Sequence, residues 1–141
     1  MPQLKNLNLE QVKNLAVKLA QEHIKKDLVI GLVGPLGSGK TTFTKSFAKE
    51  LKINSIKSPT FIVTATHFLK PDKKFYHVDL YRLNKKSDLN NIGIEEILNE
   101  KKRIALIEWA DKFPSVKKQC DLIIEFKLID SKTRNVTIHQ N

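Results

Sequence analysis

The sequence predicts an α/β fold built on a mixed sheet, with parallel central strands and an antiparallel hairpin at the C-terminus. Two short apolar runs, residues 28–33 and 104–107, have the composition of strands that are buried on both faces, as in parallel sheets. Helical spacing of apolar residues precedes and follows the first run. Residues 121–129 and 134–139 alternate apolar and polar side chains around the turn 130–133, which indicates the hairpin.

The first half of the chain predicts helix, strand, loop and helix in that order. Apolar residues at helical spacing predict an amphipathic helix over residues 9–25. Asn8, followed three residues later by Gln11, has the pattern of a capping box at its start. The strand 28–33 follows and ends in a glycine-rich loop, after which helical spacing resumes over residues 40–51.

The middle of the chain predicts shorter elements. Residues 58–60 are expected to be extended, because a proline restricts the backbone of the residue before it. Strands are predicted over 61–68 and 74–80, joined by a turn at 70–73 that contains proline and aspartate. A short helix is predicted over residues 94–100. There is no internal repeat, low-complexity tract or linker, so residues 1–141 are interpreted as one domain.

Composition excludes several classes of protein. Hydrophobic residues are 40% and charged residues 28% of the chain, the balance of a globular protein rather than a disordered one. The single cysteine, Cys120, excludes an intramolecular disulfide and a Cys-x-x-Cys zinc site; it is interpreted as a structural thiol in a reducing compartment. Neither a signal peptide nor an apolar run of about 20 residues is present. We therefore expect a cytoplasmic protein with no membrane partner.

The formal net charge of +10 allows two interpretations. The lysines either form a solvated surface or attract an anionic partner such as RNA or an acidic protein face. They are scattered along the chain and are not interleaved with aromatic residues that could stack on bases. The charge by itself therefore favours the first interpretation.

Residues Gly34 to Thr41 match the pattern Gly-x4-Gly-Lys-Thr in full. A chain that wraps a phosphate must turn its N–H groups inward, which requires positive φ and little side-chain bulk. A chance glycine-rich turn is the alternative. The loop lies between a predicted buried strand and a predicted helix, which is the context of a phosphate-binding P-loop and favours that function.

Each position of the loop has an expected role. Lys40 is a positive charge for the β- and γ-phosphates, the Thr41 hydroxyl is a Mg²⁺ ligand, and Thr42 reaches the α-phosphate. Ser38 is interpreted as a small residue whose N–H matters, rather than as a nucleophile. The residues assigned to the nucleotide here are Gly34, Leu36, Gly37, Ser38, Gly39, Lys40, Thr41 and Thr42.

Two acids end predicted strands, where open α/β sheets bind ligands. Asp79 follows the strand that includes Phe75 to Val78, and Glu108 follows the run 104–107. Each acid either caps a loop or serves a magnesium nucleotide, and the phosphate loop in the same chain favours the second role. Glu108 directly follows four apolar residues, the pattern of a Walker B motif, and is therefore the stronger candidate. It would hold Mg²⁺ through water or polarise the attacking water.

Other residues near these acids leave alternatives open. Trp109, the only tryptophan, is either a core or rim aromatic or a contact for the nucleotide or a partner. Arg82 either contacts a phosphate or pairs with a carboxylate. His67 and His77 are interpreted as packing residues of strands rather than metal ligands, since no pair of histidines has metal-ligand spacing.

Taken together, the motifs resemble one family. The segments 34–42, Ser58-Pro59-Thr60-Phe61, His77-Val78-Asp79-Leu80-Tyr81-Arg82, Gly93 and Ile107-Glu108-Trp109 occur in this order with these gaps. They resemble the bacterial TsaE proteins, the ATPases of tRNA threonylcarbamoyladenosine synthesis. The resemblance extends from the first predicted helix to Trp109 and is looser in the C-terminal hairpin.

The resemblance implies a fold, a cofactor and a set of roles. The fold would be a P-loop NTPase-like three-layer sandwich, a compact sheet flanked by helices. ATP or ADP would bind at 34–42 with Mg²⁺. Thr41 and Glu108 would serve the metal, supported by Asp79, and the catalytic residues would be Lys40, Asp79 and Glu108. Thr60, within a switch-like segment that senses the γ-phosphate, and Trp109 would lie near the nucleotide.

The resemblance also implies partners. The family associates with the TsaB–TsaD pair, in which TsaD transfers the threonylcarbamoyl group to the adenosine beside the anticodon. Hydrolysis of ATP by the TsaE-like subunit supports turnover and does not perform that transfer. Transfer RNA would be reached through the complex or through a basic surface. Position 35 departs from the family, which commonly has an acid where this chain has Pro35, so the loop lacks one N–H.

Two other functions compete with this interpretation. A small-molecule kinase would use the same loop, but kinases of this fold usually carry several arginines in a lid. This chain has only Arg82, Arg103 and Arg134. A nucleic-acid-binding module is suggested by the charge alone, and its affinity for tRNA would fall steeply with salt.

Overall fold

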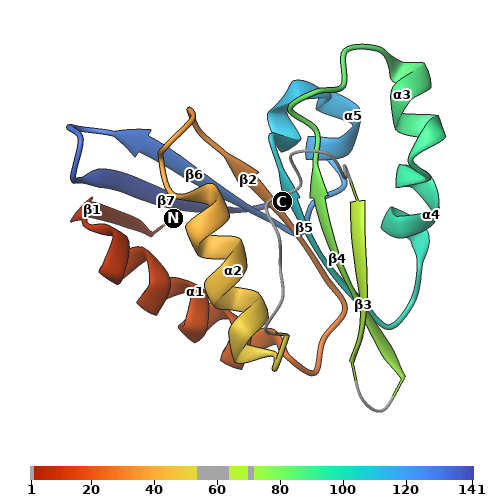
Figure 1. Ribbon diagram of the computed structural model, residues 1–141, viewed down its shortest axis with the longest axis horizontal. Helices are drawn as coiled ribbons and strands as arrows, with labels where there is room; N and C mark the ends of the chain where they lie inside the picture. Colours follow the sequence, from red (N-terminus) through yellow and green to blue (C-terminus); the bar gives the residue numbers. More distant parts are fainter. Residues whose placement is uncertain (1, 54–63, 70–71) are drawn as a thin grey trace.

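The computed structural model describes residues 2–53, 64–69 and 72–141 and forms one seven-stranded sheet (Figure 1). The strands are β1 (Gln3–Leu7), β2 (Leu28–Val33), β3 (Thr64–Leu69), β4 (Lys73–Asp79), β5 (Arg103–Glu108), β6 (Leu122–Leu128) and β7 (Arg134–Gln140). The helices are α1 (Leu9–His23), α2 (Lys40–Glu50), α3 (Lys86–Asn91), α4 (Ile94–Asn99) and α5 (Pro114–Lys117), with a 3-10 turn η1 (Ala110–Lys112).

The sheet is mixed, as the sequence predicts. Its strand order is β1-β7-β6-β2-β5-β4-β3. The central strand β2 pairs in parallel with both β5 and β6, and β4 pairs in parallel with β5. The pairs β6–β7, β1–β7 and β3–β4 are antiparallel. The C-terminal hairpin is thereby confirmed, and its first strand joins the sheet directly beside β2.

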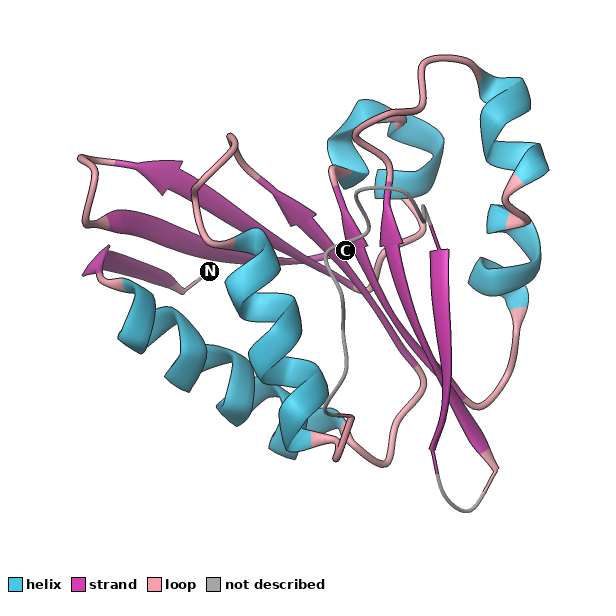
Figure 2. Ribbon diagram, in the orientation of Figure 1, coloured by secondary structure: helices cyan, strands magenta, loops and turns pink. Residues whose placement is uncertain are grey.

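Helices cover both faces of the sheet, which confirms the three-layer sandwich (Figure 2). Alternate residues of β2 point to opposite sides, so Ile30 packs with α1 and α2 whereas Val29 packs with α3, α4 and α5. All six residues of β2 and of β5 are buried, as expected of central strands in a parallel sheet. The carboxyl ends of these two strands therefore lie in the middle of one edge of the sheet.

Several local predictions are confirmed. The N-cap Asn8 accepts from the Gln11 N–H at 2.9 Å, and the Gln11 side chain accepts from the Asn8 N–H at 2.9 Å, which is the capping box. Cys120 is a buried thiol that donates to the Val116 carbonyl, and burial raises its pKa to about 12. No helix among the described residues has the length and apolar character needed to cross a membrane.

The structure adds elements that the sequence does not predict. The polar segment Gln3–Leu7 is a strand, β1, because it pairs with the edge of β7. The segment Lys86–Asn91 is a helix although only Leu89 of it is buried. The short elements η1 and α5 follow β5. The predicted extended segment 58–60, the start of the strand 61–68 and residues 70–71 of the predicted turn lie outside the described residues.

Candidate nucleotide-binding site

The glycine-rich loop joins the carboxyl end of β2 to the start of α2 (Figure 1). Its three glycines have positive φ: +155° at Gly34, +75° at Gly37 and +117° at Gly39. At Gly34 an added Cβ would also lie 2.7 Å from the Phe126 carbonyl oxygen, so this position excludes any side chain. The loop thus has the backbone that a phosphate cradle needs.

Polar groups of the loop remain available for an anion. The N-cap residue of α2 is Gly39, which has no side chain to cap the helix. The N–H groups of the first turn therefore face the loop without a side-chain acceptor. The Ser38 hydroxyl is buried and has no hydrogen-bond partner among the described residues. An unpartnered buried hydroxyl beside a helix N-terminus fits a bound phosphate.

Lys40 reaches back over the loop. Its Nζ donates to the carbonyl oxygens of Gly34 and, at 2.8 Å, of Pro35. It also lies 4.1 Å from the centroid of the Trp109 ring. Burial lowers the pKa of Lys40, while the charges of Glu108 and Asp79 oppose that shift. A phosphate on the loop would compete with the two carbonyls for this ammonium group.

Glu108 is the last residue of β5 and is 2% exposed. It lies opposite Leu32 of β2 in the parallel register and opposite Asp79 of β4. The Thr41 hydroxyl donates to Glu108 Oε1 at 2.9 Å. The first turn of α2 and the end of β5 therefore meet directly beneath the phosphate loop.

Asp79 ends β4 beside Glu108. Its Oδ1 accepts from the Tyr81 N–H at 2.9 Å. Burial is the main reason that the pKa of Asp79 is raised, and the negative charge of Glu108 adds to it, while the Tyr81 N–H opposes both. The end of β4 thus disfavours the negative charge of Asp79.

The donor set fits magnesium. A hydroxyl from Thr41 and carboxylates from Glu108 and Asp79 are hard oxygen ligands, and Mg²⁺ in nucleotide sites usually keeps several waters. Among the described residues there is no group of three or more His, Cys, Asp and Glu side chains that could hold a metal ion. With Thr41, Glu108 and Asp79 as its protein ligands, an octahedral Mg²⁺ would have positions left for phosphate and water.

His77 belongs to this site, although the sequence predicts only a packing role. It is fully buried, and its Nε2 contacts Glu108 Oε2. Its Nδ1 has no hydrogen-bond partner among the described residues. The sequence pattern that could have identified His77 is the alternation of side chains along the strand, because His77 and Asp79 point to the same side of β4. Glu108 is therefore held from two sides, by Thr41 and by His77.

Trp109 follows Glu108 in a strained conformation, with φ of +60°. Its N–H donates to the Leu32 carbonyl oxygen at 2.9 Å, which joins it to β2. The Tyr81 ring lies 5.0 Å away, centroid to centroid, and Lys40 lies over the indole. Trp109 is half-buried at the rim of the site, so both of its sequence-based interpretations stay open.

The other predicted residues are less informative. Leu36 is exposed at the tip of the loop, and Thr42 is half-buried on α2. Arg82 is exposed, which favours neither of its alternatives. Thr60 and the rest of the segment 58–61 lie outside the described residues.

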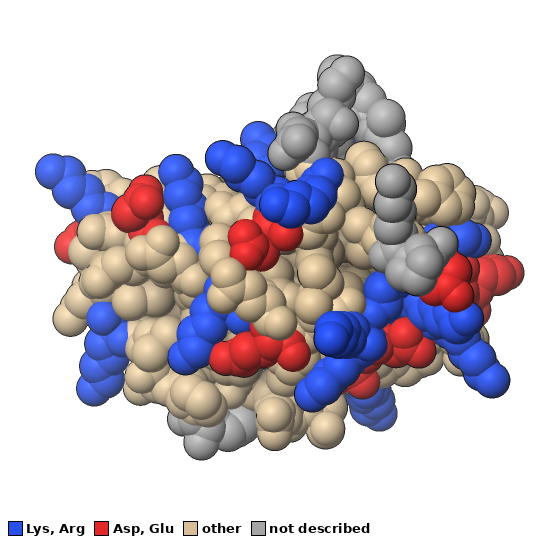
Figure 3. All heavy atoms as spheres, turned by 90° about the horizontal axis from the view of Figure 1, so that it is seen from below, with Lys and Arg blue, Asp and Glu red and all other residues tan. Residues whose placement is uncertain are grey.

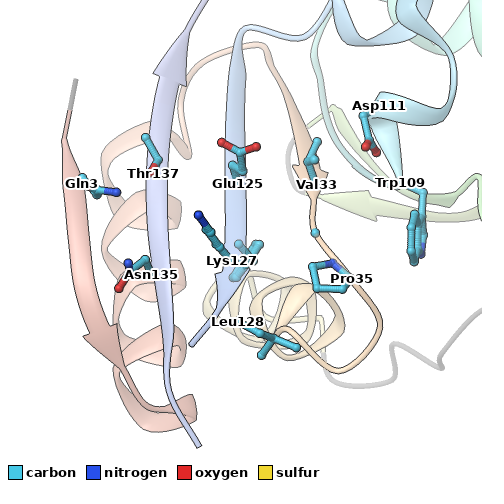
Figure 4. A pocket seen from close by; sticks show the side chains of 12 residues that line it. Gln3, Val33, Pro35, Trp109, Asp111, Glu125, Lys127, Leu128, Asn135 and Thr137 are labelled. Atoms are coloured by element: carbon cyan, nitrogen blue, oxygen red, sulfur yellow. The ribbon is translucent and has the colours of Figure 1, made fainter. Parts of the chain in front are cut away.

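A cavity of about 720 Å³ adjoins the loop (Figure 4). Figure 4 shows Gln3, Thr137 and Glu125 on three neighbouring strands, β1, β7 and β6, with Pro35 and Trp109 at the far border. Charges of both signs line it, including Asp111 and Lys127. The cavity therefore borders the candidate site without containing Thr41, Asp79 or Glu108.

The raised pKa of Asp79 predicts a stabilising substitution. A carboxylate whose pKa in the folded protein is raised above 3.8 lowers the free energy of unfolding at pH values above that folded pKa. This loss of stability disappears as the pH falls through the folded pKa. Asp79→Asn keeps the acceptor for Tyr81, so we expect it to raise Tm by about 1–3 °C at pH 7. Thermal unfolding from pH 7 to pH 3 should show this gain shrinking.

Asp88→Asn is the matched control for this prediction. The Asp88 carboxylate accepts from the N–H groups of Asn84 and Lys85, which lower its pKa. Its charge therefore stabilises the folded state above pH 3.8, and this substitution should lower Tm at pH 7. A lower Tm at pH 7 for Asp79→Asn as well would contradict the assignment of a buried, disfavoured charge.

Comparisons with known proteins agree on one family. The sequence model described as "Threonylcarbamoyl adenosine biosynthesis protein TsaE" matches residues 7–136. The tRNA threonylcarbamoyladenosine biosynthesis protein TsaE of Aquifex aeolicus is 36% identical over 135 residues, 93% of this chain and 90% of that protein. The Bacillus subtilis protein of the same description is 36% identical over 140 residues, 97% and 85% of the two chains. The crystal structure of Bacillus subtilis YdiB superposes with a TM-score of 0.72 at 27% identity, covering 99% of this chain and 86% of that one.

Proposed function

The chain belongs to the TsaE family of tRNA threonylcarbamoyladenosine biosynthesis proteins, and on this premise we propose that it is the family's ATP-binding, slowly ATP-hydrolysing subunit. The observation that supports an ATPase is the contact between Thr41 and Glu108 at the end of β5. It brings the hydroxyl of a phosphate loop and a strand-end carboxylate together, the pairing that magnesium nucleotide sites use.

The roles follow from these positions. The loop N–H groups and Lys40 would hold the β- and γ-phosphates, and Thr41, Glu108 and Asp79 would hold Mg²⁺, directly or through water. The metal, when bound, would neutralise negative charge on the phosphates. His77 would orient Glu108 toward the water or the metal ligands. Either Glu108 or Asp79 would polarise the attacking water.

The proposal includes a protein partner. Hydrolysis would support turnover of a TsaB–TsaD-like transferase, which itself transfers the threonylcarbamoyl group to tRNA. The proposed location is the cytoplasm. Thr60 and Trp109 are proposed to approach the nucleotide, with Trp109 placed to report on binding through its fluorescence, because Lys40 lies over its ring.

Hydrolysis measured with and without the partners tests this proposal. We expect slow phosphate release from MgATP by the purified protein and release at least ten times faster when the TsaB–TsaD pair is added. Formation of threonylcarbamoyladenosine over several turnovers should require this protein and ATP hydrolysis. Multiple-turnover product formation with a non-hydrolysable ATP analogue would contradict the proposed role.

Two further outcomes would point to other functions. ATP consumption that depends on an added metabolite would indicate a small-molecule kinase. Tight tRNA binding by the isolated protein, weakening steeply with salt, would indicate a nucleic-acid-binding surface. On the face shown in Figure 3, lysine and arginine side chains alternate with acidic ones and do not form one continuous basic patch. On this face, the mixture of charges agrees with the interpretation of the lysines as a solvated surface.

A further inference from the structure

Arg134, the first residue of β7, reaches the phosphate loop from the opposite end of the chain. It is 2% exposed, and its Nε donates to the Ser38 carbonyl oxygen at 3.0 Å. Its guanidinium also donates to the carbonyl oxygens of Lys132 at 3.1 Å and Leu7 at 3.4 Å. One buried side chain therefore joins the C-terminal hairpin, the first strand and the loop.

The C-terminal hairpin also packs directly against the loop. A Cβ added at Gly39 would lie 3.5 Å from the Phe126 ring, so β6 packs directly against this residue. At Gly34 the carbonyl oxygen of Phe126 leaves no room for a side chain. The conformation of the loop is thus supported by β6 and β7 as well as by its own glycines.

The contact with the Ser38 carbonyl has a geometric consequence. In a planar trans peptide the C=O and the following N–H point in opposite directions. When Arg134 holds the Ser38 oxygen beneath the loop, the N–H of Gly39 must point away from Arg134. That N–H belongs to the residue before Lys40, at the N-terminus of α2, where a phosphate would be bound.

The positive charge of Arg134 also favours the binding of an anion at the loop. None of the ion pairs among the described residues involves Arg134. The charge of Arg134 makes only a minor contribution to the lowered pKa of the exposed Asp130. A buried cation without a close carboxylate is costly, and an anion bound nearby offsets part of that cost. The buried charge therefore favours phosphate on the loop.

We propose that Arg134 is a positioning residue of the phosphate loop, which sets the direction of the Gly39 N–H through the Ser38 carbonyl. The effect on nucleotide affinity rests on the proposed function, whereas the effect on the loop does not. Arg134→Lys tests it, because lysine retains the charge but cannot reproduce the planar fork that holds several carbonyls at once.

Arg103→Lys is the matched control. Arg103 is 8% exposed and donates to the backbone carbonyls of Ile97 at 2.9 Å and Leu98 at 2.7 Å. It begins β5, at the opposite end of that strand from Glu108. The two substitutions therefore remove similar buried contacts, but only one of them touches the loop.

Two measurements are compared, each below the Tm of all variants. Amide hydrogen exchange of the segment 34–40 without nucleotide should be at least tenfold faster in Arg134→Lys and unchanged in Arg103→Lys. The Kd for MgADP, followed by calorimetry, should rise at least tenfold in Arg134→Lys only. Arg134→Gln provides a second variant that removes the charge as well and should weaken MgADP further.

The outcomes separate the two proposals. Faster loop exchange in a protein whose wild type binds no MgADP would refute the proposed function and leave the positioning role intact. Unchanged exchange and affinity in Arg134→Lys, or equal effects of Arg103→Lys, would overturn the positioning role. Loss of the fold in both Arg134→Lys and Arg134→Gln, with Arg103→Lys folded, would assign Arg134 a general structural role instead.

Discussion

Glu108→Gln is expected to reduce partner-stimulated ATP hydrolysis at least 100-fold, within the range known for loss of a general base or metal-supporting carboxylate. The substitution keeps the size of the side chain and an oxygen that can accept from Thr41. It removes the negative charge that would hold Mg²⁺ or polarise water. Nucleotide binding should persist, because the loop and Lys40 are unchanged.

Glu100→Gln is the control for this experiment. Glu100 precedes β5 at the end opposite Glu108, and its carboxylate also accepts a side-chain hydrogen bond, from Tyr76. Phosphate release with the TsaB–TsaD pair and the Kd for MgADP should be measured for both variants. A Glu108→Gln protein that hydrolyses ATP at the wild-type rate with its partners would refute the role given to this carboxylate.

Lys40→Met is expected to weaken MgATP binding at least 100-fold, since it removes a charge-assisted hydrogen bond to the phosphates in a site that excludes much of the solvent. Stability should change little or improve. Burial lowers the pKa of Lys40, so its charged form costs folding stability below the folded pKa, and methionine removes that cost.

Lys73→Met is a closely matched control. The Lys73 Nζ likewise donates to two backbone carbonyls, of Ile24 at 3.0 Å and of Lys26, and burial lowers the pKa of Lys73 too. It lies at the start of β4, remote from the loop. Calorimetric titration with MgATP should show wild-type affinity for Lys73→Met; equal losses in both variants would indicate a nonspecific effect of charge.

The sequence predicted the elements whose cause is local. The strand 28–33, the capping box at Asn8 and the C-terminal hairpin follow from the composition and spacing of neighbouring residues, and all three are confirmed. The segment Gln3–Leu7 could not be predicted, since it is polar and becomes a strand only by pairing with β7, more than 120 residues later in the chain; one such contact, Asn6 to Asn135, spans 129 residues.

The candidate site likewise combines features with a local cause and features that depend on contacts between distant residues. The phosphate loop can be identified from the sequence itself, because three glycines between a buried strand and a helix permit the positive φ that such a loop requires and that the structure shows. The surroundings of the loop were decided by the tertiary structure. The contacts of Thr41 with Glu108 and of Arg134 with Ser38 join residues 67 and 96 positions apart. Only the order of the strands in the sheet, with β5 and β6 on either side of β2, brings those side chains to the loop.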